Sequence, residues 1–221
     1  VRGDRIKTWL TLLDGADVTD DVQPLEADGI KVKLVPASRT NLKVTWPEDV
    51  VMAEQLMAGE TRSGIGVDIH RLESGRPLIL GGVRIPFSKG PDGHSDADLV
   101  CHALTDALLG ATGGGDIGKR FGVAKPSTKN MRSTEFLRTV VAEARARGWK
   151  PVNADVTVIL QAPKLGTYRE KMRISLAGIL GLSVDRVSVK ATTAKRLGAI
   201  GEGQAIGCVA ILSARCMSEP D

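Results

Sequence analysis

The segment GIGVDIHRL, residues 64–72, constrains the fold most because it fits two incompatible structures. Its two glycines, one residue apart, could belong to a loop that binds phosphate, but such a loop ends a strand and opens a helix. Here the alternation of apolar and polar residues continues past Gly66 into Asp68 and His70. We therefore predict a strand with its isoleucines and valine on one face and the acid and the imidazole on the other.

The chain after residue 62 continues to alternate between strand-like and helix-like patterns. LILGGVRI, residues 78–85, predicts a hairpin that turns at its two glycines. Ser133 is expected to cap the second of three helices and Gly148 to end it. The order predicts an α/β or α+β fold with one mixed sheet packed against helices. The helices are expected at residues 95–110, 133–148 and 168–180, and the further strands at residues 152–160, 186–193 and 205–214.

Residues 1–61 are predicted to form a smaller domain with a linker, and residues 62–221 the main domain. Within the first we expect a strand at residues 30–36 and a helix that opens at Pro47. Proline at the first helical position, followed by two acidic residues, suits a helix N-terminus. With so few apolar anchors, this part would be marginally stable on its own.

Composition narrows the classes of function. The net charge is +4 with scattered lysines and arginines, and aromatic residues make up 3% of the chain. Nucleic-acid binding usually needs a basic stripe or stacking aromatics, so we do not expect it. No apolar run approaches about 18 residues, so no membrane-spanning helix is expected. Three widely spaced cysteines fit neither a disulfide framework nor a cysteine zinc site, which favours a reducing, cytoplasmic compartment.

Asp68 and His70 are candidate metal ligands, because residues two apart on a strand lie about 6–7 Å apart on the same face. His102, on the predicted helix, would be the third ligand. Asp98, His102 and Asp106 are four apart in turn and line one helical face, so a neighbouring carboxylate could hold the imidazole. Two histidines and one carboxylate leave a zinc ion an open position, as catalytic sites do. Alternatively, both helical aspartates are solvated and His102 is a half-buried residue with satisfied hydrogen bonds.

His94 and Ser95 stand at the N-terminus of this helix, where backbone N–H groups favour an anion. If the helix starts at Ser95, His94 and His102 are about 12 Å apart along its axis and cannot share one ion. An equally good interpretation makes Ser95 the N-cap, with Asp98 completing a capping box. Both can hold, because a cap can also border a phosphate.

Together these motifs resemble a known family. GIGVDIHRL, LILGGVRIPF, GHSDADLVCHALTDALLGATGGGDIGKRF, NADVTVILQAPKLGTYREKMR and VSVKATTAKRLG are similar to 2-C-methyl-D-erythritol 2,4-cyclodiphosphate synthase, over residues 62–214. Residues 18–57 resemble the C-terminal end of 2-C-methyl-D-erythritol 4-phosphate cytidylyltransferase. The order implies a bifunctional fusion, present here without most of its first domain. We therefore expect no cytidylyltransferase activity from these 221 residues.

The resemblance implies a homotrimer with active sites between subunits. It implies conversion of 4-diphosphocytidyl-2-C-methyl-D-erythritol 2-phosphate into the cyclic diphosphate, with release of CMP. Asp68, His70 and His102 would hold Zn²⁺ or another divalent cation. The remaining implied roles are catalysis by His94 and Thr193, and substrate binding by Ser95, Asp116, Ile117, Gly118, Phe121, Ala162, Pro163, Lys164, Thr192 and Lys195.

Several positions depart from the pattern of that family. Lys195 stands where the family has a glutamate that helps to hold a second cation, typically Mg²⁺. A protonated lysine cannot ligate Mg²⁺, although it can neutralise phosphate directly. Glu202 and Gln204 replace residues that are common near the trimer axis, and Val123 lies in a substrate-covering loop that has lost its acids. The departures leave the second cation and the rate of turnover open.

Two other functions remain open from the sequence. The chain could be a trimeric module that binds zinc and CMP but has lost turnover, or a generic zinc phosphoesterase that uses metal-bound water. Without the resemblance, the glycines before Asp116 indicate only a flexible turn, and Lys164 only a solvated charge. Lys43, which falls where the cytidylyltransferase holds its phosphate substrate, would be an exposed charge beside a strand.

Overall fold

The computed structural model describes residues 42–57, 59–93, 96–122 and 132–217, and the single positions 23, 26, 29, 31, 33, 35 and 36. The chain divides into two units, Val1–Met57 and Ala58–Asp221. The predicted strand at residues 30–36 falls mostly outside the described residues, and its described positions are not in a strand.

The first unit contains helix α3 (Pro47–Met57), which begins at the predicted proline. The Asp49 carboxylate accepts hydrogen bonds from the backbone N–H groups of Thr45 and Trp46, both at 2.9 Å. It thereby satisfies donors that the start of a helix leaves without intrahelical partners. Lys43 is exposed, as expected for a surface charge.

The second unit is built around a five-stranded sheet with the order β4-β1-β7-β5-β6, beside a two-stranded sheet of β2 and β3. In the larger sheet β5 and β6 are parallel, and the other neighbours are antiparallel. The predicted mixed sheet is therefore confirmed. The strands are β1 (Thr61–Ser74), β2 (Leu78–Leu80), β3 (Val83–Ile85), β4 (Lys89–Pro91), β5 (Trp149–Ile159), β6 (Val187–Thr192) and β7 (Ala205–Cys216).

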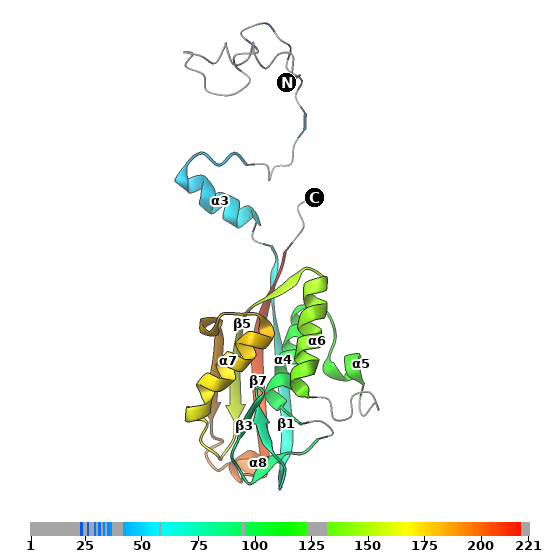
Figure 1. Cartoon of the computed structure of the whole chain (residues 1–221), viewed down its shortest axis with the longest axis vertical. Coiled ribbons are helices and arrows are strands. Elements are labelled where there is room, and N and C mark those ends of the chain that lie inside the picture. The colour runs from blue at the N-terminus through cyan, green and yellow to red at the C-terminus, as the bar shows by residue number, and fades with distance from the viewer. Residues whose placement is uncertain are drawn as a thin grey trace. The chain divides into compact units, whose positions relative to one another are not determined.

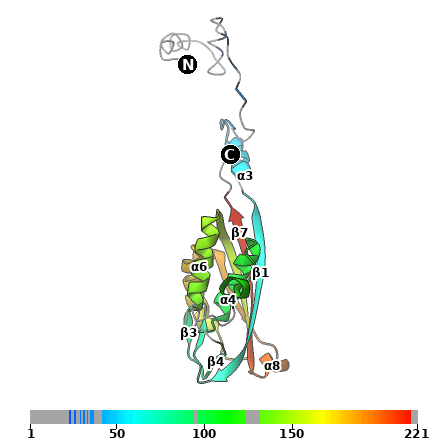
Figure 2. The same ribbon diagram turned by 90° about the vertical axis from the view of Figure 1, so that its right-hand side faces the viewer.

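The three long helices of this unit, α4, α6 and α7, cover one face of the sheet (Figure 1, Figure 2). The helical elements are α4 (Leu99–Ala111), α5 (Ile117–Phe121), α6 (Ser133–Ala146), η3 (Gly166–Tyr168), α7 (Arg169–Leu180), η4 (Val184–Arg186) and α8 (Gly198–Gly201). Among the described residues, no helix has the length and apolar character needed to cross a bilayer.

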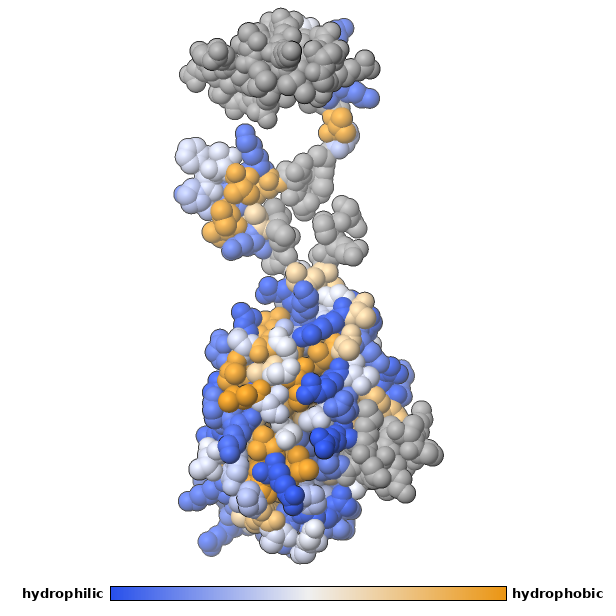
Figure 3. Space-filling model, viewed as in Figure 1, coloured by the Kyte–Doolittle hydropathy of each residue, from blue (hydrophilic) through white to orange (hydrophobic). Residues whose placement is uncertain are grey.

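The core lies between these helices and the sheet. The apolar positions of α4 are fully buried, as are Leu137 of α6 and Leu176 of α7. On the outside of the helical layer the surface is mostly hydrophilic, with apolar residues in small groups between charged ones (Figure 3). Helices α6 and α7 are therefore amphipathic and bury one face each, whereas α4 is buried on almost all sides.

Helix α4 begins later than the sequence predicts. It starts at Leu99, and its N-cap is Asp98, whose carboxylate accepts hydrogen bonds from the backbone N–H groups of Val100 and Cys101. The expectation of a helix that starts at Ser95 is therefore wrong.

The Asp98 carboxylate also has a long-range role. It accepts hydrogen bonds from the N–H groups of Gly81 and Gly82 at 2.8 and 2.6 Å. Both glycines have positive φ, as a two-residue hairpin turn of this kind requires. Asp98 is completely buried, and burial raises the pKa of its carboxyl group. One carboxylate thus caps α4 and attaches the β2–β3 hairpin to it, a contact between segments that spacing along the helix does not reveal.

Helix α6 ends as predicted, with Gly148 in a positive-φ conformation just after its last turn. Its beginning differs from the prediction, because the N-cap is Arg132 and Ser133 is the first helical residue. The Ser133 hydroxyl is directed instead at the side chains of His102 and Asp96.

Candidate metal centre

Strand β1 and helix α4 bring together the three predicted metal ligands. Asp68 and His70 lie on the face of β1 that is turned toward α4, and His102 lies on the first turns of that helix. One ligand atom from each residue lies within 4.8 Å of the other two. Asp68 Oδ2 is 3.0 Å from both His70 Nε2 and His102 Nδ1.

The two glycines of the opening segment explain how a helix comes so close to this strand. A Cβ atom at Gly64 would lie 2.0 Å from the carbonyl oxygen of Ala107, and one at Gly66 would lie 1.9 Å from that of Ala103. Real side chains cannot occupy such positions, so both residues must be glycine for α4 to pack on β1 at this distance. The glycines therefore serve packing, which places His102 opposite the strand's own ligands.

The surroundings keep Asp68 ionised. Burial by itself raises the pKa of the Asp68 carboxyl, but hydrogen bonds from His102 and His70 outweigh it and lower the pKa to about 2. The Asp68 carboxylate in turn raises the pKa of His70. The side chains of Asp68, His70 and His102 are 22%, 21% and 17% exposed, so an ion from solution can reach them.

Hydrogen bonds on the far side of each imidazole direct its other ring nitrogen toward this centre. His70 Nδ1 lies 2.6 Å from the backbone carbonyl oxygen of Asp92, which can only accept, so this nitrogen carries a proton. His102 Nε2 lies 2.9 Å from the Ser133 hydroxyl. The expectation that a carboxylate of the same helix holds His102 is wrong, because Asp98 binds the hairpin and Asp106 accepts the N–H of Ile117 at 2.7 Å.

The donor set fits a divalent metal ion. One carboxylate oxygen and two imidazole nitrogens are ligands that Zn²⁺ accepts, and three protein ligands leave a coordination position for a substrate oxygen. The same set also suits other first-row divalent ions, so the chemistry of the donors does not fix the identity of the metal. The centre is chemically able to polarise an oxygen of a bound anion.

A short segment after α4 lies next to this centre. The Asp116 side chain caps α5 through the N–H of Lys119 at 2.7 Å, and Asp106 of α4 holds the N–H of Ile117. Burial raises the pKa of Asp106. Phe121 packs against Phe136, with ring centroids 4.8 Å apart. The ring centroids of Phe136 and His102 are 6.1 Å apart. The predicted residues 116–118 and 121 are therefore attached to the metal-centre side of the unit.

A separate pocket of about 430 Å³ brings together another group of predicted residues. It is lined by Pro163, Lys164, Thr192, Thr193 and Lys195, whereas the predicted Ala162 is absent from the lining. The other lining residues were not predicted from the sequence, among them the polar Gln161 and Arg169. Arg169 is the first residue of α7, and nothing in its position along the sequence indicated that it lines the pocket. Three cationic side chains and no carboxylate line the pocket, which suits a phosphorylated ligand.

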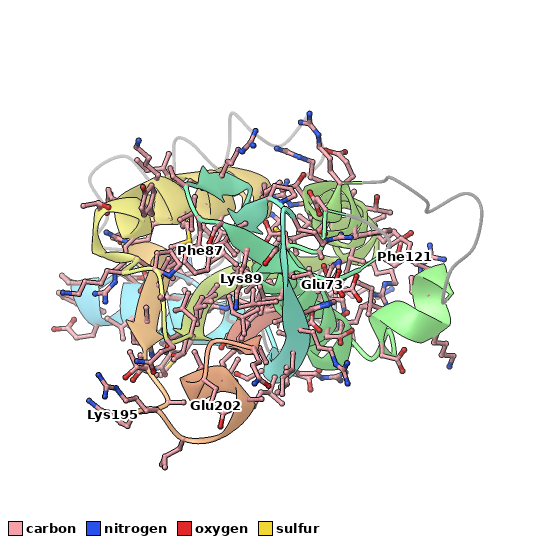
Figure 4. The ribbon with its side chains drawn as sticks, turned by 90° about the horizontal axis from the view of Figure 1, so that it is seen from below. Glu73, Phe87, Lys89, Phe121, Lys195 and Glu202 are labelled. Atoms are coloured by element: carbon pink, nitrogen blue, oxygen red, sulfur yellow. The ribbon has the colours of Figure 1, made fainter. Side chains whose placement is uncertain are left out.

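Within one chain the pocket and the metal centre are far apart. The strand register aligns Asp68 with Cys208, Cys208 with Val158, and Val158 with Ala191, which lines the pocket. Three strand spacings separate the ends of this row, or about 14 Å. Figure 4 accordingly shows Lys195 and Phe121 at opposite sides of the unit. One ligand could contact both kinds of site only if the pocket came from a second chain or if the ligand were long enough to span this distance.

Three positions predicted from the sequence, His94, Ser95 and Val123, lie outside the described residues. The anion site at Ser95 therefore stays a prediction. The expected separation of His94 and His102 assumed a helix that starts at Ser95 and no longer follows, and the interpretation of Ser95 as the N-cap is wrong because the N-cap is Asp98.

Comparison with known proteins gives the context for this geometry. The YgbB family matches residues 61–215, and 2-C-methyl-D-erythritol 4-phosphate cytidylyltransferase matches residues 7–59. A bifunctional enzyme IspD/IspF of Desulforudis audaxviator is 45% identical over 202 residues, which cover 91% of this chain and 51% of the relative. That of Mesorhizobium japonicum is 44% identical and covers 89% of this chain and 50% of the relative. The chain thus spans about half the length of these curated relatives.

Solved structures agree in fold. The bifunctional IspDF of Campylobacter jejuni has a TM-score of 0.69 and 33% identity, covering 95% of this chain and 57% of that one. A 2C-methyl-D-erythritol-2,4-cyclodiphosphate synthase has a TM-score of 0.64 and 41% identity, and the match covers 68% of this chain and 98% of the synthase. An IspF from Plasmodium falciparum, solved as a CDP complex, has a TM-score of 0.64 and 32% identity, with 72% of this chain and 99% of that one covered.

Proposed function

Because the chain belongs to the YgbB family, we propose that its unit Ala58–Asp221 cyclises 4-diphosphocytidyl-2-C-methyl-D-erythritol 2-phosphate to 2-C-methyl-D-erythritol 2,4-cyclodiphosphate, with release of CMP. The observation that carries the proposal is the convergence of Asp68, His70 and His102. These residues lie in a chain that matches nearly the whole length of a solved cyclodiphosphate synthase.

The reaction needs no nucleophile from the protein. An oxygen of the 2-phosphate attacks the diphosphate phosphorus that is distal to the cytidine, and the bond from that phosphorus to the CMP oxygen breaks. The attacking group and the phosphorus centre both belong to an anionic substrate, so the protein must hold them in line and neutralise charge. Residues that bind, orient and carry positive charge suffice for this task.

The chain's own residues divide this work. Asp68, His70 and His102 would hold Zn²⁺ or another divalent cation, which when bound polarises a phosphoryl oxygen and orients the substrate. His94 and Thr193 would steady the transition state from opposite sides. Residues 116–118 and Phe121 would bind the methylerythritol part, together with Ser95.

The cationic pocket would take the cytidine and phosphate part. The CDP complex of the Plasmodium falciparum relative supports a nucleotide ligand for this fold. Lys164, Thr192 and Lys195 line the pocket here, and Ala162 and Pro163 belong to the same loop. Since no carboxylate is among the lining residues, Lys195 would neutralise phosphate directly, and a second cation such as Mg²⁺ would have no carboxylate ligand there.

Three copies would complete the sites. In one chain the metal centre lies on β1 and the pocket at β6, three strands away, so a pocket from a neighbouring copy is needed beside each centre. The strand face opposite α4 supports such an assembly. Ile65, Val67 and Ile69 on it are 63%, 54% and 63% exposed, which is unusual for an apolar row.

The homotrimer makes a testable prediction. Sedimentation equilibrium of the 221-residue chain should give three times its mass of 23.4 kDa. Val67→Lys should produce monomers, because it places a charge in the middle of the apolar row. Ile174→Lys is the matched control: Ile174 is 55% exposed but lies on α7, and its variant should stay trimeric. A monomeric wild-type protein would contradict the assembly.

The proposed reaction is tested by CMP release. The purified chain should release one CMP for each cyclic diphosphate formed. Removal of divalent metal with a chelator should lower the rate at least about 100-fold, because the metal ligands then lose the ion that polarises the phosphoryl group. Re-addition of Zn²⁺ should restore it. A rate that chelation leaves unchanged would contradict the metal-dependent mechanism.

One observation favours a second candidate, a trimeric module that binds zinc and CMP without turnover. Lys195 lines the nucleotide pocket in a positive-φ conformation, and its charge differs from that of the glutamate implied by the family resemblance. Tight binding of CMP and zinc without product would favour this candidate, and Lys195→Glu would then restore turnover. Phosphate release from simple esters would instead indicate a phosphoesterase.

A further inference from the structure

The partner of His102 on its outer side is a serine from a different helix. Ser133 is the first residue of α6, is completely buried, and places its hydroxyl 2.9 Å from His102 Nε2. The same hydroxyl makes a short hydrogen bond with Asp96 Oδ1. These contacts form an unbroken chain from Asp96 through Ser133 to His102, and from His102 Nδ1 to Asp68.

The direction of the hydrogen bonds in this chain follows from the groups involved. Asp96 Oδ1 accepts the backbone N–H of Ser133 at 3.0 Å, so this oxygen is an acceptor. A serine hydroxyl has only one proton, which is therefore donated to Asp96 Oδ1. The hydroxyl oxygen is left to accept, so Nε2 of His102 carries a proton and donates it. Nδ1 hydrogen-bonds to the Asp68 carboxylate at 3.0 Å, and it becomes the ligand atom when a metal ion displaces the proton between them.

From this chain we infer that Ser133 and Asp96 are positioning residues for the metal centre. They fix the tautomer and the ring orientation of His102, so that Nδ1 is held ready as a ligand. The inference deepens the proposed function, since it concerns the affinity of the same three residues for their ion. Partners that hold a metal-binding histidine in this way typically change metal affinity 10- to 100-fold when removed.

A purely structural role for Ser133 predicts a different pattern. Serine at the start of a helix usually caps it, but here the N-cap is Arg132 and it makes no side-chain cap hydrogen bond. The hydroxyl is used instead on the imidazole and on Asp96, and it also accepts the backbone N–H of Asp98 at 3.3 Å. If the serine served only the helix, its removal would lower stability without changing how tightly the folded protein binds metal.

Zinc affinity of the full 221-residue chain tests the inference, measured by competition with a chromophoric chelator. Ser133→Ala should weaken zinc binding about 10- to 100-fold in a protein that still folds. Ser133→Thr, which keeps the hydroxyl, should recover most of the affinity. Asp96→Asn should cause a smaller loss, and the double variant should bind no more weakly than Ser133→Ala alone, because both residues act through one chain.

Thr105→Val provides the matched control. Thr105 is also buried on α4, and its hydroxyl donates to the carbonyl oxygen of Cys101 rather than to an imidazole. Its variant should bind zinc within about twofold of the wild type. Equal zinc affinity of Ser133→Ala and wild type would overturn the inference.

A second readout depends on no variant. Nitrogen-15 NMR of the zinc-loaded wild-type protein should show His102 with its proton on Nε2 and the ion on Nδ1, and Asp96→Asn or Ser133→Ala should introduce a second state of the ring. A zinc-loaded wild type in which Nε2 of His102 carries no proton would overturn the inference even if Ser133→Ala failed to fold. A wild type that binds no zinc but still shows a proton on Nε2 would refute the proposed metal centre and leave the hydrogen-bond assignment intact.

Discussion

His102→Ala is expected to remove both metal binding and CMP release. The substitution deletes one of three ligands, and the two that remain, Asp68 and His70, come from the same strand. Loss of a group that only supports a ligand already costs about 10- to 100-fold in affinity, so loss of the ligand itself should cost at least about 100-fold. Zinc content after dialysis and the rate of CMP release measure the two effects.

The fold should survive this substitution. His102 is only half-buried, and α4 is held by the apolar residues of its other face. The thermal midpoint of metal-free His102→Ala should therefore stay near that of the metal-free wild type. Thr105→Val, one turn further along α4, controls for a general disturbance of the helix and should keep full zinc content. Stoichiometric zinc in His102→Ala would show that the ion is bound elsewhere.

The sequence predicts this centre largely because two of its ligands are only two residues apart along the chain. Alternation along β1 places Asp68 and His70 on the same face, and no tertiary information is needed for that step. Joining His102 to them required the further assumption that α4 packs on this face of β1. The same alternation predicted the apolar row beginning at Ile65, but it did not predict that this row is exposed in the single chain.

The features that the sequence did not predict are contacts between distant segments. Ser133 reaches His102 across 31 positions, and Asp98 reaches the hairpin across 16 and 17. In each case a residue with a strong local preference, serine and aspartate near a helix start, supports a local capping interpretation. For Ser133 that interpretation was wrong, because the N-cap is Arg132. For Asp98 it was incomplete, because this residue caps α4 and also holds the hairpin, and periodicity says nothing about which segment lies beside a helix.

Gly66→Ala is expected to have the largest effect on the fold. An added Cβ would lie 1.9 Å from the carbonyl oxygen of Ala103 and 2.9 Å from the backbone nitrogen of Ala107, and backbone atoms of a helix cannot turn aside as a side chain can. Helix α4 would have to move away from β1 by about 1–2 Å for ordinary van der Waals contact. We expect a loss of about 3 kcal/mol or more in the free energy of unfolding, measured by chemical denaturation.

The same displacement connects packing to function, because α4 carries His102 while β1 carries the other two ligands. Any Gly66→Ala protein that folds should therefore bind zinc at least about tenfold more weakly, although no ligand has been changed. Gly178→Ala is the matched control: it lies inside α7 with open space around its Cβ position, so alanine should leave zinc affinity unchanged and stabilise the helix by up to about 1 kcal/mol. A stable Gly66→Ala protein with normal zinc affinity would mean that the close contact between α4 and β1 does not set the geometry of the metal centre.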